Sequence, residues 1–199
     1  MFYFFCLRIL TPLAKCIFPF QVKGTENIPT SGRLIVCCNH KSLIDPFLLA
    51  VPFKRQIRFM AKSELFQDHG ALVCRLLYTL GAFPVKRDKG DAESIKTAMH
   101  ILNCGGVVGI FPQGKCIFDN SPFRPKAGVA LVAAKTHAPS LPASLYCDDI
   151  IQPFRHITVR FGKVIPYEAL NIKENSHASV REASEIIAQR INELLEEKN

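Results

Sequence analysis

The stretch that decides the fold is Leu34-Ile-Val-Cys-Cys-Asn-His-Lys-Ser-Leu-Ile-Asp-Pro46. Its apolar run from Leu34 to Cys38 predicts a buried strand, and His40 stands just past the end of that strand. Asp45 follows five residues later. Residues five apart on a continuous helix point about 140° away from each other, so His40 and Asp45 cannot share one helix face. At least one of them must lie off the helix that follows.

Two helix starts satisfy this condition. In the first, Ser42 caps the helix and Asp45 occupies its third position, as in the Ser-x-x-Asp form of the capping box. In the second, Asp45 is the cap and Pro46 is the first helical residue, where its missing N–H costs nothing. Both starts let the loop fold the His40 imidazole back over the Asp45 carboxylate.

A histidine paired with a carboxylate can act as a general base. Imidazole titrates near neutral pH, and the carboxylate fixes its tautomer and stabilises the imidazolium formed when it takes up a proton. The simpler interpretation is that Asp45 only caps a helix and that His40 is a polar residue at a strand end. The spacing alone leaves both interpretations open.

Size and composition indicate one globular domain with a substantial core. The chain has 199 residues, of which 48% are hydrophobic, and its mean hydropathy is +0.13. Its 25 basic and 17 acidic residues give a net charge of +8. This excess predicts an anionic partner, such as a lipid surface, nucleic acid or a phosphorylated substrate.

Eight cysteines are scattered along the chain without a C-x-x-C pair, and several lie inside apolar runs. We interpret them as reduced core residues of a cytosolic protein. A metal site built from Cys37, Cys38 and His40 is disfavoured, because adjacent residues of a strand point to opposite faces. No zinc-ligand spacing is present, and we expect no metal.

The first 20 residues are rich in aromatic side chains but are interrupted by two cations and two prolines. A spanning helix needs about 20 apolar residues with few charges, which this segment does not provide. It also lacks the basic start and the small-residue cleavage site of a signal peptide. We interpret residues 1–19 as an amphipathic segment in a membrane interface, with Arg8 and Lys15 reaching lipid phosphates. The alternative is a core helix that happens to come first. Residues 20–199 form the remaining domain.

Short apolar runs and stretches of helical spacing alternate along that domain. The runs predict a short strand and a turn at 21–29, an extended piece at 83–87, and strands at 56–61, 107–111, 141–146 and 157–161. The spacings predict a helix from Asp45 to near Pro52 and helices at 70–80, 91–103, 129–136 and 176–197. This alternation predicts an α/β fold, a single domain with a largely parallel central sheet flanked by helices.

The segment from Gly109 to Cys116 nearly matches the phosphate-binding P-loop pattern G-x-x-x-x-G-K-[ST]. It places Cys116 where a magnesium-binding hydroxyl belongs, and Pro112 removes one of the N–H groups that would cradle phosphate. These departures disfavour nucleotide binding. Arg87 and Lys126 also end or follow predicted elements, so cations converging at the strand ends predict a site for a single phosphate. Each cation taken separately is a typical solvated surface charge.

These residues resemble the glycerolipid acyltransferase family, and most closely its 1-acyl-sn-glycerol-3-phosphate acyltransferases. The first block of that family, N-H-x-S-x-x-D, is matched by residues 39–45, and the second, G-x-x-x-x-x-R, by residues 81–87. The third, F-P-E-G-T-R-S, keeps Phe111, Pro112 and Gly114. The following K-x-G fits residues 126–128, and the proline of the fourth block fits Pro142. The similarity covers roughly residues 20–165.

The resemblance implies transfer of a fatty acyl group from a thioester, on coenzyme A or acyl carrier protein, to the free hydroxyl of lysophosphatidic acid. The residue at His40 would deprotonate that hydroxyl and the residue at Asp45 would orient His40, with no metal and no bound cofactor. Gln113, Lys115 and Cys116 replace the Glu, Thr and Arg of the third block. We expect Lys115 to take over contact with the phosphate and Gln113 to keep hydrogen bonds. The expected acceptor phosphate-binding residues are Arg87, Gln113, Gly114, Lys115 and Lys126.

The expected partners are an anionic membrane surface, the lysophospholipid acceptor, and acyl-CoA or acyl carrier protein, with no nucleic acid. The expected location is the cytoplasmic face of the cell membrane, as a peripheral or monotopic protein. Two alternatives remain: an acyltransferase for a different lysophospholipid, and a relative that binds membranes or lipids without catalysis. The altered third block favours the latter, and the intact first block opposes it.

Overall fold

The computed structural model describes residues 2–68, 70–85 and 92–197. Within these residues the strands form one seven-stranded sheet in the order β1-β7-β6-β2-β5-β3-β4. All neighbouring strands pair in parallel except β6 and β7. The strands are β1 Phe20–Lys23, β2 Leu34–Cys38, β3 Ile57–Lys62, β4 Phe83–Val85, β5 Val107–Ile110, β6 Ser140–Tyr146 and β7 Ile157–Phe161. The largely parallel α/β sheet predicted from the sequence is confirmed.

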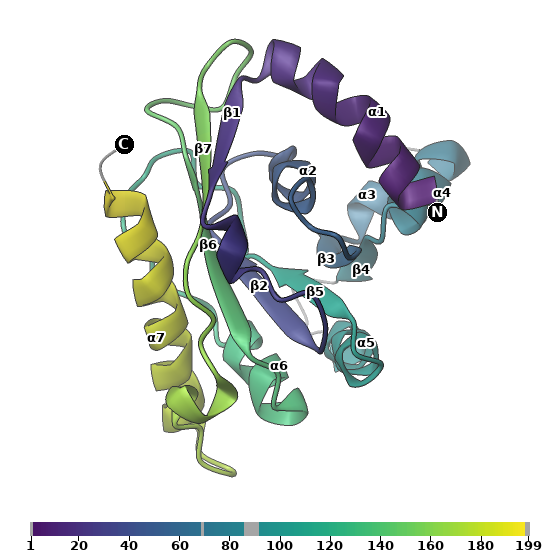
Figure 1. Ribbon diagram of the computed structural model, residues 1–199. Helices are drawn as coiled ribbons and strands as arrows, with labels where there is room; N and C mark the ends of the chain where they lie inside the picture. Colours follow the sequence, from purple (N-terminus) through teal and green to yellow (C-terminus); the bar gives the residue numbers. More distant parts are fainter. Residues whose placement is uncertain (1, 69, 86–91, 198–199) are drawn as a thin grey trace.

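The helices flank this sheet on both faces (Figure 1). They are α1 Phe2–Ile17, α2 Asp45–Ala50, α3 Glu64–Gln67, α4 Gly70–Thr79, α5 Ala92–Asn103, α6 Gly128–Thr136 and α7 His177–Glu196, with 3-10 turns η1 Thr25–Asn27 and η2 Tyr167–Leu170. The predicted helices are found within a few residues of their expected ends. The four-residue helix α3 was not predicted, because it is too short to show a helical repeat.

Two cores form because successive side chains of a strand point to opposite faces of the sheet. From β2, Ile35 and Cys37 pack against α5, α6 and α7, whereas Val36 and Cys38 pack on the other face with α2. The long helix α7 buries Ala183, Ile187 and other residues at helical spacing. Both faces of the central strands are therefore covered, as a mostly parallel sheet requires.

Helix α1 lies apart from the sheet and reaches α3 and α4 at its N-terminal end (Figure 1). It continues through Pro12 and buries only Tyr3 and Leu7, which pack with Ala50 of α2. Its other apolar side chains are largely exposed, so the amphipathic segment expected here is a helix with an apolar face open to its surroundings. None of the described helices is long and apolar enough to cross a membrane. The division at residues 19 and 20 stays a prediction.

The interpretation of the cysteines as core residues was wrong in part. Only Cys37, Cys38 and Cys147 are buried, whereas Cys16 and Cys104 are exposed. Cys16 lies in the last turn of α1, and Cys104 directly follows the last residue of α5. All eight are free thiols.

Candidate active site

The histidine stands where β2 leaves the sheet. The side chain of Asn39 fastens this end of β2 to β6, because its Nδ2 donates to the carbonyl of Leu145 at 3.0 Å and its Oδ1 accepts from the Leu145 N–H at 2.7 Å. The chain turns away at His40 and returns at Asp45, where α2 begins. Since β2, β5, β3 and β6 run in the same direction, their carboxyl ends meet at this edge, which is where ligands bind in open α/β sheets.

The structure brings the two side chains of the first block into contact. Nδ1 of His40 lies 2.7 Å from Oδ2 of Asp45. The same oxygen accepts the backbone N–H groups of Lys41 and Ser42, at 2.7 Å and 2.9 Å. Asp45 is completely buried, while 8% of the surface of His40 is exposed. The carboxylate is therefore held by the loop itself, and the imidazole reaches the surface.

Neither of the two predicted helix starts is adopted in full. Asp45 is the first residue of α2 and Pro46 the second. The Asp45 carboxylate accepts from the Ser42 N–H, which is one half of a capping box. The hydroxyl of Ser42 accepts from the Ile44 N–H at 3.5 Å instead of from Asp45. Asp45 thus stabilises the loop before the helix and contacts His40 with one oxygen.

This geometry fixes the tautomer of the histidine. An ionised carboxylate can only accept hydrogen bonds, so Nδ1 of His40 carries the proton and Nε2 is left as an acceptor. Such an imidazole can take a proton from a hydroxyl group, and Asp45 stabilises the positive charge that results.

The imidazole is seated on a stack of aromatic rings. It lies parallel to the ring of Phe111, with centroids 4.1 Å apart, and Phe111 lies parallel to Phe59 at 5.8 Å. Phe59 pairs with Gly109 across β3 and β5, and a Cβ atom at Gly109 would stand 2.3 Å from the Phe59 ring. The missing side chain of Gly109 therefore makes room for the ring that supports the histidine.

An apolar cavity of about 350 Å³ opens beside His40. Its walls come from α1, α2, β3 and α4, and they include Tyr3, Leu7, Phe47, Phe59, Leu77 and Leu80. Apolar walls of this kind bind hydrocarbon, because moving apolar surface out of water is favourable. The reactive nitrogen thus borders a space suited to an alkyl chain.

The loop after β5 holds the backbone of His40 from both sides. Oε1 of Gln113 accepts the His40 N–H, and the His40 carbonyl accepts the N–H of Ile117 at 2.7 Å. Gln113 is buried, and its oxygen serves to position the histidine backbone. This role of Gln113 was missed because the two residues lie 73 positions apart in the sequence.

The expected phosphate-binding residues are only partly brought together. Lys126 lies against Gly114, because a Cβ atom there would stand 3.0 Å from the Lys126 Nζ, and the Lys126 N–H donates to the carbonyl of Pro112 at 2.8 Å. Gly114 has a φ of 71°, which glycine adopts readily. Lys115 is exposed and lines a neighbouring hollow with Cys116. Arg87 lies outside the described residues.

A buried lysine next to the histidine was not foreseen. Lys41 is 1% exposed, and its Nζ donates to Asn120 Oδ1 at 2.7 Å and to the Cys147 carbonyl at 3.1 Å. Burial lowers the pKa of Lys41, while nearby Cys147, Asp119 and Asp45 act in the opposite direction. Its ammonium joins the loops after β5 and β6. No local sequence signal distinguishes it from a surface lysine.

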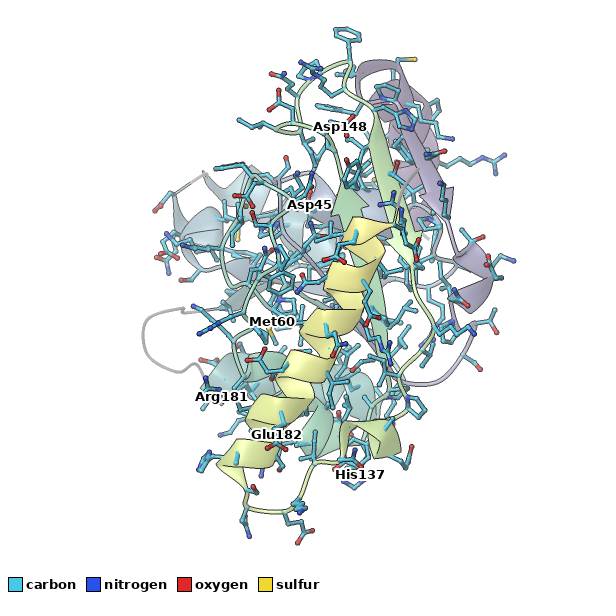
Figure 2. The ribbon with its side chains drawn as sticks, turned by 90° about the vertical axis from the view of Figure 1, so that its left-hand side faces the viewer. Asp45, Met60, His137, Asp148, Arg181 and Glu182 are labelled. Carbon is cyan, nitrogen blue, oxygen red and sulfur yellow. The ribbon has the colours of Figure 1, made fainter. Side chains whose placement is uncertain are left out.

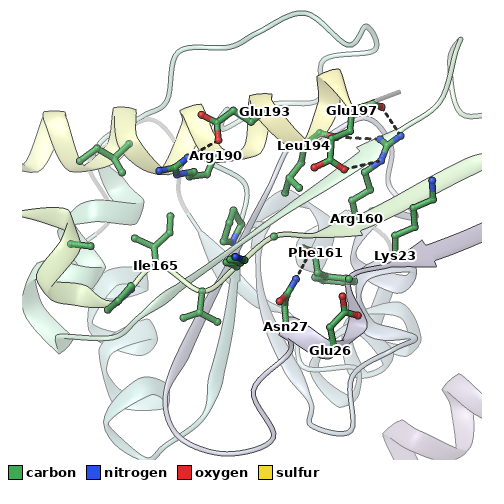
Figure 3. Close-up of a pocket in the computed structure, with 18 residues that line it drawn as sticks. Lys23, Glu26, Asn27, Arg160, Phe161, Ile165, Arg190, Glu193, Leu194 and Glu197 are labelled. Atoms are coloured by element: carbon green, nitrogen blue, oxygen red, sulfur yellow. Dashed lines mark hydrogen bonds and ion pairs between the residues drawn. The ribbon is translucent and has the colours of Figure 1, made fainter. Parts of the chain in front are cut away.

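A second hollow of about 680 Å³ lies between β7 and α7 (Figure 3). Its two arginines, Arg160 and Arg190, are engaged by groups of the protein itself. Arg160 donates to the carbonyls of Leu194 and Glu197 at the end of α7, at 3.2 Å and 3.0 Å, and Arg190 pairs with Glu193 at 2.8 Å. We interpret this hollow as the seam that fixes α7 to the sheet. Among the described residues there is no group of three or more His, Cys, Asp or Glu side chains that could hold a metal ion.

Comparison with known proteins agrees with this geometry. The family model described as Acyltransferase matches residues 19–146, a span that holds the histidine, the carboxylate and the loop after β5. The chain belongs to the Acyltransferase family.

The chain is also similar to curated proteins. A Bacillus subtilis protein named 1-acyl-sn-glycerol-3-phosphate acyltransferase is 34% identical over 145 residues, covering 71% of this chain and 70% of the relative. The chloroplastic 1-acyl-sn-glycerol-3-phosphate acyltransferase BAT2 of Brassica napus is 28% identical over 69% of this chain, which spans only 41% of that protein. The resemblance drawn from the sequence blocks is confirmed.

A solved structure shows the same fold. The crystal structure of the 1-acyl-sn-glycerophosphate acyltransferase PlsC from Thermotoga maritima has a TM-score of 0.73 and 21% sequence identity, and the match covers 99% of this chain and 83% of that one. As an O-acyltransferase, the protein needs a base for the attacking hydroxyl and a place for the acyl chain. His40 and the apolar cavity stand side by side at the same edge of its sheet.

Proposed function

We propose that this acyltransferase moves a fatty acyl group from a thioester to the free hydroxyl of lysophosphatidic acid and so produces phosphatidic acid. The observation that carries the proposal is the 2.7 Å contact between His40 Nδ1 and Asp45 Oδ2 beside an apolar cavity. The names of the curated relatives support the acceptor. The donor is acyl-CoA or acyl carrier protein.

The reaction needs one base and one apolar site. Nε2 of His40 takes the proton of the acceptor hydroxyl, while the hydroxyl oxygen attacks the thioester carbonyl carbon and forms a C–O bond. The C–S bond then breaks, and the departing thiolate takes the proton back from the imidazolium. Asp45 stabilises the imidazolium between these two steps. The acyl chain lies in the cavity, so the carbonyl carbon is held next to His40.

Recognition of the acceptor phosphate rests on Lys126 and Lys115, together with Arg87. Lys126 is supported by its position against Gly114, and the loop that carries Lys115 is tied to the His40 backbone. A lysine is a point charge and cannot grip a phosphate with two parallel hydrogen bonds as arginine does. The altered third block is therefore expected to change acceptor affinity more than the chemical step.

We further propose that α1 binds the surface of an anionic membrane, at the cytoplasmic face of the cell membrane. Phe2, Phe5, Ile9, Leu13 and Ile17 form one exposed apolar stripe along the helix. The exposed cations Arg8 and Lys15 lie seven residues apart and share a neighbouring face. Such a helix lies in a membrane interface, with the cations reaching lipid phosphates.

The decisive experiment compares the wild-type protein with His40→Ala. Each is incubated with labelled acyl thioester, on coenzyme A and on acyl carrier protein, and with lysophosphatidic acid. We expect labelled phosphatidic acid from the wild type and a rate about 10²- to 10⁴-fold lower from His40→Ala. His100→Ala, which removes an exposed histidine from α5, is the control and should keep full activity. Full product formation by His40→Ala would refute the mechanism, and no product from the wild type would favour lipid binding without catalysis.

A further inference from the structure

Large exposed apolar side chains gather at one edge of the molecule. Among the described residues, those outside α1 lie mostly on loops that follow the carboxyl ends of β2, β5 and β6, the edge that also carries His40. Tyr78 of α4 is the exception. The loop residues are Leu43, Phe118, Ile150 and Phe154. Single exposed apolar residues are normal on a protein surface, but their concentration at one edge indicates a contact.

Phe154 is the most unusual of these residues. Its side chain is 77% exposed, and its φ of 67° is one that bulky residues rarely adopt. The backbone conformation has a local reason, because the Phe154 N–H donates to the carbonyl of Ile17 at 2.6 Å and so caps the end of α1. Glycine would make the same bond with less strain. The cap therefore explains the backbone of residue 154 but not its aromatic ring.

The same bond places Phe154 beside the exposed apolar stripe of α1. Figure 1 shows the loop between β6 and β7 at the end of the molecule where α1 meets β1. Figure 2 shows Asp148, in this loop, far from His137, Arg181 and Glu182 at the opposite end. Leu43 is 76% exposed and lines the apolar cavity together with Tyr3 and Leu7 of α1. The cavity, α1 and the loop thus belong to one side of the protein.

The cations that suit an anionic surface lie mainly on α1 beside the loop, where Arg8 and Lys15 are exposed. Arg155 is exposed directly after Phe154, and the whole chain carries a net charge of +8. Residues 148–155 themselves contain two acids and one base, so the basic excess comes from α1 and the rest of the chain. Asp149 lies 3.7 Å from Arg155, and Asp148 accepts the hydroxyl of Tyr146 at 2.7 Å. An exposed aromatic ring beside a helix with an apolar stripe and exposed cations is typical of segments that enter the interface of an anionic membrane.

We propose that residues 148–155 form a second membrane contact, which inserts Phe154 into an anionic bilayer beside α1. The proposal rests on the proposed function, because its lipid substrates are drawn from that bilayer. A single helix lying in an interface leaves the protein free to rotate about the helix axis. A second contact displaced from that axis fixes the rotation, and it turns the cavity beside His40 toward the lipid.

The test is the binding of Phe154→Gly to vesicles of phosphatidylcholine and phosphatidylglycerol. Glycine keeps the bond to Ile17 and removes only the ring. We expect partition of the variant into the vesicles to be about tenfold weaker, which corresponds to the transfer free energy lost when one partly inserted phenylalanine side chain is removed. The Tm of the variant should equal or exceed that of the wild type. Asn171→Gly is the matched control, because Asn171 is also exposed and has a positive φ of 50°. Asn171 ends η2, which lies at the opposite end of the molecule, where its Tyr167 stacks on His137. The control variant should bind as the wild type does.

Wild-type binding by Phe154→Gly would overturn the proposal. It would also be overturned if, without vesicles, the wild type sediments as a dimer and Phe154→Gly as a monomer, since the ring would then serve contact between two copies of the chain. Acyl transfer between short-chain, water-soluble substrates separates this proposal from the proposed function. Phe154→Gly should keep the wild-type rate in that assay. A wild type that binds vesicles through Phe154 but transfers no acyl group would refute only the proposed function.

Discussion

Replacing Asp45 with asparagine tests the contact on which the proposed mechanism depends. The substitution keeps the size of the side chain and an oxygen that can accept the N–H groups of Lys41 and Ser42. It removes the negative charge next to His40. The new amide nitrogen takes the place of Oδ1, which is buried and has no hydrogen-bond partner among the described residues. Leaving it unpaired costs about 1–3 kcal/mol of stability.

The effect on catalysis follows from the charge. When His40 takes a proton, the imidazolium and the carboxylate carry opposite charges about 4 Å apart, and at an effective dielectric constant of about 20 their attraction is about 4 kcal/mol. Asparagine loses most of this stabilisation, which exists only after the proton has moved. Since each 1.36 kcal/mol changes a rate tenfold, kcat should fall about 10³-fold.

The assay measures kcat with saturating acyl thioester and acceptor, at a temperature well below the Tm of the variant. The KM of the acceptor should change little, because Asp45 is completely buried and does not reach the substrate. Asp68→Asn, which changes an exposed acid at the end of α3, is the control and should keep the wild-type kcat. A kcat for Asp45→Asn within tenfold of the wild type, from folded protein, would show that the dyad is not the base.

Lys126→Ala should raise the KM of lysophosphatidic acid at least tenfold while changing kcat less than threefold, because a hydrogen bond to a charged group contributes about 1.5–3 kcal/mol. The control is Lys135→Ala, at an exposed lysine of α6, which should leave this KM unchanged. An unchanged KM in Lys126→Ala would show that Lys126 does not bind the acceptor. Burial raises the pKa of the Cys37 thiol from 9.0 to about 12. Above pH 9 the unfolded chain therefore loses a proton that the folded chain keeps. The free energy of unfolding then falls by about 1.4 kcal/mol per pH unit until about pH 12. Thermal unfolding of the wild type and Cys37→Ala between pH 8.5 and 10.5 should therefore show a shallower loss of Tm in the variant, and parallel slopes would contradict this origin.

Much of the site could be predicted because its central pair is local in sequence. His40 and Asp45 are separated by one short loop, and the strand and helix that bracket it are marked by an apolar run and by Pro46. The spacing excluded a shared helix face, which left a loop that folds back as the simplest way to bring the two side chains together. The structure adds that one carboxylate oxygen also accepts two backbone N–H groups of that loop.

The parts that could not be predicted depend on contacts between distant segments. Gln113 reaches the His40 backbone from the loop after β5. Phe59 supports the histidine only because β3 pairs with β5 in a register that sets it across Gly109. Lys41 looks like a surface cation until the loops after β5 and β6 close over it.

The sequence by itself determined the class of fold, the position of the histidine and carboxylate, and the membership that its ordered blocks indicate. Those features are written in periodicity and in short spacings, which act through neighbouring residues. Only the tertiary structure decided what surrounds the pair: the aromatic stack beneath His40, the cavity beside it, and the exposed edge formed by α1 and the loop of Phe154. The physical reason is that strand order and register set which side chains meet, and a local pattern does not specify either of them.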